Sequence, residues 1–182
     1  MPNLDPKACL ITAAEIAAAP EIHVRQPFNP NSQVYLRSLG QAAGLARQQL
    51  AIGRVPPGKD SFEPHAHARD EEFLYILSGR GRATIGDQVF EVGSGDFMGF
   101  TAPSLAHNLS NPYDQDLVYL MGGERSGLDV VDFPRAGKTV IFSAERIQAA
   151  DSATLEPMSF ADYLPDGLPE AIRKMMAESK EK

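Results

Sequence analysis

Two histidines that stand two residues apart are the first residues in this sequence whose type and spacing suit metal binding. They lie in the segment Pro64-His65-Ala66-His67. On an extended chain such residues point to the same face about 6.7 Å apart. Two imidazoles so placed can converge on one ion at about 2.0–2.1 Å each. Taken alone, the motif is more typical of a pair of solvated loop histidines.

A carboxylate follows, where Glu71 and Glu72 open the apolar run Phe73–Leu77. Side chains alternate between the two faces of a strand. If Leu74 and Ile76 point into a core, Glu72 shares their face, and burial of that lone carboxylate costs several kcal/mol unless a cation relieves it. The opposite alternation selects Glu71, and a polar strand entry is the ordinary alternative for both residues.

A third candidate ligand is His107, which stands four residues before Asn111. Its ordinary alternative is a histidine satisfied at a strand edge. His23, between Ile22 and Val24, belongs to no such motif and we interpret it as a structural residue. The combination of three histidines with a carboxylate indicates a metal site that no single motif would establish.

The segment that carries these residues, roughly 41–125, is dense in short strands. Turn signals such as Pro56-Pro57-Gly58 and Gly86-Asp87 recur every 8–12 residues or so, which is typical of an all-β barrel or sandwich. We expect strands at Leu45–Val55, Glu72–Leu77, Arg82–Ile85, Gln88–Val92, Asp96–Phe100, His107–Leu109 and Leu117–Met121.

Two flanking segments complete the predicted organisation. Residues 1–40 form an N-terminal arm, with a short helix that starts at the capping box of Thr12 and Glu15 and one strand at Gln33–Leu39. Residues 126–182 form a C-terminal extension, with one further strand at Thr139–Phe142 and a terminal helix from Pro169 to about residue 179.

Composition excludes several classes of protein. The 182 residues suit one domain, and a net charge of −7 argues against nucleic acid or an anionic membrane as partner. No apolar stretch is long enough to span a bilayer. The single cysteine, Cys9, excludes an intrachain disulfide and a Cys-rich zinc site, so a cytoplasmic setting fits best.

The spacing of the first group of ligands resembles the cupin family. Cupins carry a motif of the form G-x5-H-x-H-x(3,4)-E-x6-G. The chain matches it with His65, His67, Glu72 and Gly79, apart from one extra residue after Gly58. The number of residues between the carboxylate and Gly79 fits the motif for Glu72 and not for Glu71.

The second cupin motif has the form G-x5-P-x-G-x2-H-x3-N. His107 and Asn111 match its end and Gly95 its beginning, whereas the loop between departs from it. Thr101 replaces the motif's proline, Pro103 stands near its second glycine, and the loop is one residue longer than usual. The departure concerns the loop conformation and leaves the ligands intact.

This resemblance, over about residues 45–123, implies an all-β double-stranded β-helix, also called a jelly-roll barrel, that is usually a homodimer. It implies one divalent Fe, Mn, Ni, Zn or Cu ion held by His65, His67, Glu72 and His107. The segment Asp129–Lys138 looks like the tail of small bacterial cupins whose function is largely unassigned. The strand Gln33–Leu39 could add to a neighbour's sheet edge in such a dimer.

Four protein ligands on an octahedral ion leave two positions for water, dioxygen or a substrate. We therefore expect a metal-dependent enzyme acting on a small polar metabolite, of the dioxygenase, isomerase or decarboxylase type. A non-catalytic module that binds or senses a small ligand is the alternative, and a metal-free structural role is the third. Candidates for a second catalytic group, each equally consistent with barrel packing, are Arg47, Tyr75, Met98 and Tyr119.

Overall fold

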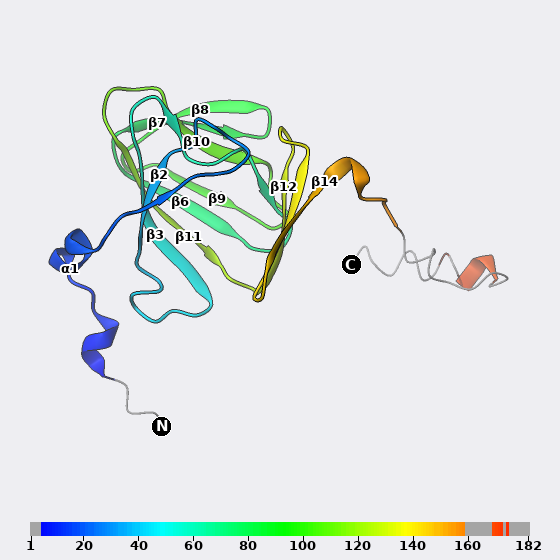
Figure 1. Cartoon of the computed structure of the whole chain (residues 1–182), viewed down its shortest axis with the longest axis horizontal. Helices are drawn as coiled ribbons and strands as arrows, with labels where there is room; N and C mark the ends of the chain where they lie inside the picture. Colours follow the sequence, from blue (N-terminus) through cyan, green and yellow to red (C-terminus); the bar gives the residue numbers. More distant parts are fainter. Residues whose placement is uncertain (1–4, 159–168, 173, 175–182) are drawn as a thin grey trace. The chain divides into compact units, whose positions relative to one another are not determined.

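The fold of the chain is almost entirely β-structure (Figure 1), seen in a computed structural model that describes residues 5–158, 169–172 and 174. The elements are η1 (Pro6–Cys9), α1 (Ala13–Ala18), β1 (Ile22–Val24), β2 (Val34–Ser38), β3 (Gln48–Val55), β4 (Lys59–Asp60), β5 (Ala66–His67), β6 (Glu72–Ser78), β7 (Arg80–Ile85), β8 (Gln88–Gly93), β9 (Phe97–Phe100), β10 (His107–Asn111), β11 (Leu117–Glu124), β12 (Leu128–Phe133), β13 (Lys138–Ser143), β14 (Ile147–Asp151) and η2 (Ser152–Thr154).

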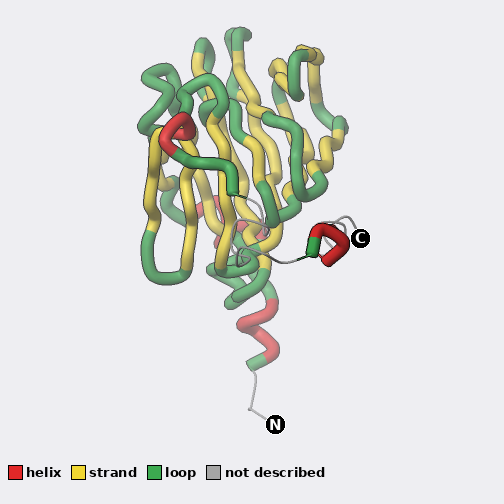
Figure 2. The backbone as a smooth tube through the Cα atoms, turned by 90° about the vertical axis from the view of Figure 1, so that its right-hand side faces the viewer, coloured by secondary structure: helices red, strands yellow, loops and turns green. Residues whose placement is uncertain are grey.

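The strands form three antiparallel sheets. The first has the order β1-β2-β3-β11-β6-β9, the second β4-β10-β7-β8, and the third β14-β13-β12-β5. Non-consecutive neighbours, such as β11 between β3 and β6, show that the chain crosses back and forth, as a jelly roll requires. Figure 2 shows the strands running side by side through the body of Met1–Ser152, which is one compact unit. The predicted all-β jelly-roll fold is confirmed.

The core lies between the inner faces of the first two sheets. Strand β6 shows the alternation most clearly, with Leu74 and Ile76 buried and Tyr75 and Leu77 exposed. The largest buried side chains of this core come from several strands: Val34, Val55, Ile76, Leu109, Leu117 and Tyr119. Because Leu74 and Ile76 point inward, Glu72 points inward with them.

The N-terminal segment forms as its sequence predicts and then adds a strand. Thr12 caps α1, its hydroxyl accepting a hydrogen bond from the Glu15 amide while the Glu15 carboxylate accepts one from the Thr12 amide. Strand β1, which the sequence pattern does not predict, pairs with β2, and β2 pairs with β3. Since β2 is hydrogen-bonded on both sides within the chain, it is not the free edge strand that the dimer hypothesis used.

The segment after residue 125 holds three strands where one was predicted. The predicted strand at Thr139–Phe142 is β13, and β12 and β14 lie on either side of it. The chain divides after Ser152, and the second unit is described only at 153–158, 169–172 and 174. It is helical at 170–172 and 174, and the rest of the predicted terminal helix lies outside the described residues. Among the described helices, none is long and apolar enough to cross a membrane.

Candidate metal centre

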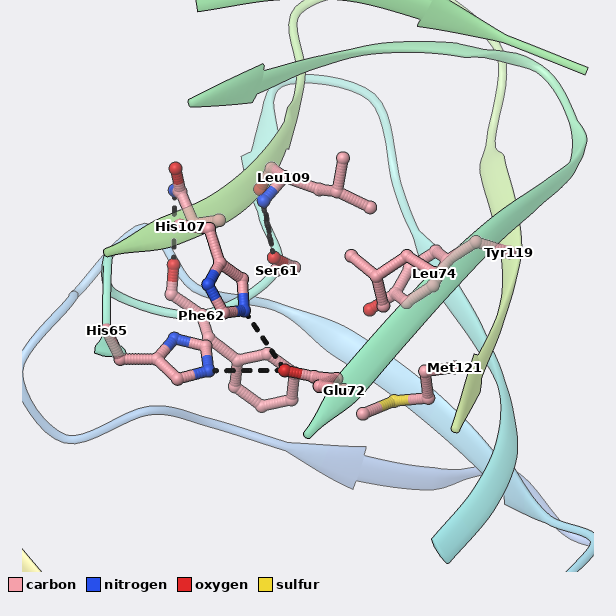
Figure 3. Close-up of a pocket in the computed structure, with 10 residues that line it drawn as sticks. Ser61, Phe62, His65, Glu72, Leu74, His107, Leu109, Tyr119 and Met121 are labelled. Atoms are coloured by element: carbon pink, nitrogen blue, oxygen red, sulfur yellow. Dashed lines mark hydrogen bonds and ion pairs between the residues drawn. The ribbon is translucent and has the colours of Figure 1, made fainter. Parts of the chain in front are cut away.

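Four side chains from three separate stretches of the sequence meet at one point in the barrel. One ligand atom from each of His65, His67, Glu72 and His107 lies within 4.8 Å of all the others. His67 ends β5, Glu72 begins β6 and His107 begins β10. His65 pairs with His107 through an isolated antiparallel bridge, so backbone pairing itself holds these two histidines opposite each other. In Figure 3 the rings of His65 and His107 point at the Glu72 carboxylate.

The distances suit a shared cation. Glu72 Oε2 lies 3.0 Å from His107 Nε2, 3.5 Å from His67 Nε2 and 4.0 Å from His65 Nε2. Two donor atoms that bind one ion at about 2.1 Å and at right angles would be about 3.0 Å apart. The three distances from Glu72 equal this value or exceed it by at most 1.0 Å, so small movements of the side chains would bring the donors onto one ion.

The proton positions of the three histidines are set from outside the cluster. His65 Nδ1 lies 2.9 Å from the Glu63 carbonyl oxygen, and His107 Nδ1 lies 2.9 Å from the Leu105 carbonyl oxygen. His67 Nδ1 lies 2.6 Å from Asp129 Oδ2. Carbonyl and carboxylate oxygens accept hydrogen bonds, so each Nδ1 carries the proton and donates it. With this arrangement of Nδ1 donors, a bound ion would meet three neutral imidazoles, each with its Nε2 lone pair directed at the cluster.

Burial and hydrogen bonding shift the pKa values of three residues of the cluster. Burial lowers the pKa of His65 to about 4. Burial also acts to lower the pKa of His67, but hydrogen bonds with Glu72 and Asp129 outweigh it and raise that pKa to about 9. For Glu72, burial favours the neutral acid, yet bonds from His107 and His67 hold its pKa well below the usual range. The ionised Glu72 is thus stabilised by the imidazoles beside it, a role that a bound cation would share.

Aromatic rings fix the orientation of two of the imidazoles. Phe100, at the end of β9, stacks on His107 with ring centroids 3.6 Å apart and an interplanar angle of 5°. Phe133, at the end of β12, stacks on His65 at 5.8 Å and 27°. These contacts restrict rotation of the two rings about their side-chain bonds.

Below the cluster the barrel is nearly filled. The cavity there has a volume of about 10 Å³, roughly the space of one water molecule. Its walls come from the side chains drawn in Figure 3: Ser61, Phe62, His65, Glu72, Leu74, His107, Asn108, Leu109, Tyr119 and Met121. The Tyr119 hydroxyl is buried and has no hydrogen-bond partner among the residues that the structure describes. A substrate cannot enter this cavity without displacing side chains.

A wider pocket of about 470 Å³ shares Glu72 with that cavity and offers the room that a small metabolite needs. Its lining combines aromatic, polar and acidic side chains with two glycines: Gln48, Glu71, Glu72, Phe73, Phe97, Gly99, Phe100, Thr101, Gly123 and Glu124. Two arginines are sequence neighbours of residues that line this pocket: Arg47 directly precedes Gln48, and Arg125 directly follows Glu124. The Arg125 amide donates to the Arg47 carbonyl oxygen at 3.1 Å, so the two meet at the edge of this pocket.

The candidates for a second catalytic group differ in their burial and in their position relative to the two pockets. Tyr119 lines the narrow cavity, whereas Tyr75 is 39% exposed on the opposite face of its strand. Met98 is buried in the core opposite Leu74, as packing predicts. Arg47 is exposed. Glu71 is exposed too and lines the wider pocket, so it stands beside the four-residue cluster and not within it.

Two residues that contact the cluster were missed in the sequence. Asp129 and Phe133 both lie on β12, which passes beside β5 with Val131 opposite His67. In the sequence, the segment from Asp129 onward shows only a family likeness. The available signal was an acidic residue ahead of an alternating apolar run, and that pattern alone does not say which ligand the acid would reach.

Comparison with known proteins identifies the family. The model for the cupin domain matches residues 51–123. A crystal structure described as a putative sugar phosphate isomerase, from Acidithiobacillus ferrooxidans, is 34% identical, with a TM-score of 0.81 over 85% of this chain and 99% of that one. A sugar phosphate isomerase of the cupin superfamily from Silicibacter pomeroyi has a TM-score of 0.70 at 19% identity, over 79% of this chain and 94% of that one.

A curated relative is an uncharacterized protein from Methanocaldococcus jannaschii, 38% identical over 65 residues. The match covers 36% of this chain and half the length of that relative. The fold, the two sequence motifs and these likenesses agree, and the chain belongs to the cupin superfamily.

Proposed function

We propose that this cupin is a metal-dependent enzyme that converts a small polar metabolite, with His65, His67, Glu72 and His107 as the ligands of one divalent ion. The observation that carries the proposal is the convergence of three Nε2 atoms on the Glu72 carboxylate, each ring having its Nδ1 held by an acceptor. Such a convergence of nitrogen and oxygen atoms requires either protons or a cation between them, and a divalent ion can accept an electron pair from all four residues at once. The residues present therefore fit a bound metal.

The donor set and charge narrow the class of ion. Three imidazoles and a carboxylate suit Fe, Mn, Ni, Zn or Cu, and availability decides among such ions more than affinity does. The two largely buried carboxylates at the cluster, Glu72 and Asp129, together balance the charge of a divalent cation. When bound, the ion would polarise a carbonyl or hydroxyl oxygen of the substrate.

We propose isomerisation of a phosphorylated sugar as the first reaction to test. Support comes from the Acidithiobacillus ferrooxidans protein, whose likeness at 34% identity extends over 85% of this chain. Such a reaction moves a proton between neighbouring carbons and needs a base. Glu71 and Glu124 line the wider pocket and are candidates for this base, while Arg47 and Arg125 at its edge are candidates for binding the phosphate.

The alternative is a non-catalytic module that binds or senses a small ligand. One observation favours it: the cavity below the cluster holds no more than about one water molecule. A ligand would then stay in the wider pocket. Tight binding of sugar phosphates without any product would favour this alternative over the enzyme.

The test of the metal site is metal content by mass spectrometry on protein without a histidine tag. We expect about one equivalent per chain in the wild type, and loss of it in His107→Ala and in Glu72→Gln. Glu72→Gln keeps the shape of the side chain and guards against a folding defect in His107→Ala. His23→Ala is the matched control, since His23 is exposed and stacks on Tyr35, away from the cluster. Full metal content in both ligand variants would contradict the proposal.

The test of the reaction is conversion of aldose and ketose phosphates by the metal-loaded protein. We expect turnover that disappears with chelation and returns when the same ion is added back. Turnover that persists in Glu72→Gln without metal would place the chemistry elsewhere. The homodimer expected from the family likeness is a separate proposal, and sedimentation of a monomer would refute it.

A further inference from the structure

The three candidate histidine ligands do not have equivalent outer partners. His65 and His107 donate from Nδ1 to neutral backbone carbonyls, whereas His67 donates to the carboxylate of Asp129 at 2.6 Å. Asp129 is only 4% exposed and belongs to β12, outside the part of the chain that matches the cupin domain model. One ligand is thus held by a charged group from the appended third sheet.

The Asp129 carboxylate is itself immobilised. Its Oδ1 accepts from the Arg69 amide at 3.0 Å and from the Val130 amide at 2.9 Å, which leaves Oδ2 directed at His67. Strand pairing sets the distance between the two groups, because Val131 lies opposite His67 in the β12–β5 ladder. The carboxylate cannot turn without losing both hydrogen bonds that it accepts from backbone amides.

We propose that Asp129 is the positioning residue of the metal centre, which fixes His67 with the proton on Nδ1 and so keeps the Nε2 lone pair available for the ion. The inference rests on the proposed metal site and extends it to a residue beyond the matched cupin domain. A carboxylate partner also makes the imidazole a stronger ligand than a neutral carbonyl partner does, and loss of such partners costs typically 10–100-fold in metal affinity.

The Asp129→Asn variant gives an outcome specific to positioning. Asparagine keeps one oxygen, and the amides of Arg69 and Val130 both require an acceptor on the Oδ1 side. The amide nitrogen of Asn then faces His67 Nδ1 and can only donate. His67 must accept this bond and carry its proton on Nε2, where it blocks the ion. We therefore expect a conservative substitution that preserves the backbone contacts and yet fails to preserve metal binding.

The experiment uses the full chain with Zn²⁺ as probe. Affinity is measured by competition with a chelator, and the proton position on His67 by nitrogen-15 NMR with and without zinc. We expect Asp129→Asn to bind zinc at least tenfold more weakly, with a proton-free Nδ1 on His67, at an unchanged melting temperature of the metal-free protein. Asp132→Asn is the matched control, because Asp132 lies on the same strand but its Oδ1 accepts from the Thr139 hydroxyl. The control should bind zinc like the wild type.

Two results would overturn the inference. One is zinc affinity in Asp129→Asn within twofold of the wild type. The other is an equal loss in Asp132→Asn, which would indicate a general effect of damaging β12. A wild type that binds no zinc would instead refute the proposed metal site. The NMR comparison on metal-free protein, made above the pKa of His67 of about 9 where the ring holds one proton, would still decide whether Asp129 sets the position of that proton.

Discussion

A methyl group added at Gly53 should disturb both the core and the proposed metal centre. Gly53 lies in β3 directly opposite Tyr119 of β11. A Cβ atom at this position would be 2.5 Å from Tyr119 Cζ, 2.8 Å from its hydroxyl oxygen and 2.9 Å from Cε1. Real Cβ atoms do not approach other atoms so closely, so the tyrosine ring must move. The free space beside it is about 10 Å³, and Glu72 lines the same cavity.

The expected cost of Gly53→Ala follows from this overlap. Extra methyl groups in a packed core typically cost about 1–3 kcal/mol. For a protein of this size, each kcal/mol lowers the melting temperature by about 2–4 °C, so we expect a drop of roughly 2–12 °C. Thermal unfolding followed by circular dichroism measures it. Because displacement of Tyr119 disturbs Glu72, zinc affinity should fall in the same variant.

A double-mutant cycle and a matched glycine isolate the cause. Tyr119→Val removes the overlapping atoms, so the cost of Gly53→Ala should shrink by about 0.5–3 kcal/mol in its presence. Gly93→Ala is the control, since its Cβ would meet nothing nearer than 3.9 Å. At such a position, alanine changes stability little or raises it by about 0.4–1 kcal/mol. Equal stability of Gly53→Ala and Gly93→Ala would refute the close approach of Tyr119 to β3.

Two further predictions concern metal removal and pH. A metal that binds only the folded protein adds about 2.7 kcal/mol to the free energy of unfolding when its free concentration is 100 times its dissociation constant. Chelation should therefore lower the melting temperature by roughly 5–11 °C. An unchanged melting temperature in calorimetry would contradict a contribution of the ion to stability. Hydrogen bonds from Arg54 are the main cause that lowers the pKa of Glu21, and nearby Arg37 adds to it. At pH 7 the unfolding free energy of the wild type should therefore exceed that of Glu21→Gln by up to about 1 kcal/mol. This difference should vanish as the pH falls from about 4 through the lowered pKa of Glu21. A difference that grows toward acid pH would contradict the prediction.

The sequence predicts the barrel and its four candidate ligands because both depend on short-range patterns. Alternation in β6 places Leu74 and Ile76 inside, and the same parity selects Glu72 over Glu71. The strand ends from β6 to β11 differ from the predicted ones by only a few residues. Spacing within a strand and turn residues at its ends are local properties, so they can be predicted from the sequence without knowledge of the fold.

What the sequence does not predict depends on long-range register. Asp129 and Asp132 are both acids on β12, and only the pairing of β12 with β5 decides that Asp129 reaches His67. The two partners are 62 residues apart, and β5 is only two residues long, too short for a periodic signal. Similarly, only the completed barrel distinguishes Tyr119, which lines the cavity, from Tyr75, which points outward.

Each of the three sheets contributes one candidate ligand: Glu72 from the first, His107 from the second and His67 from the third. An ion held by these side chains is a cross-link among the three sheets, in addition to direct hydrogen bonds such as that from the Asn111 side chain in β10 to the Val55 carbonyl oxygen in β3. Local opening of any one sheet would then require release of the ion. Amide protons in all three sheets should therefore exchange with solvent as one cooperative unit when metal is bound, and as separate units with different opening energies when it is absent.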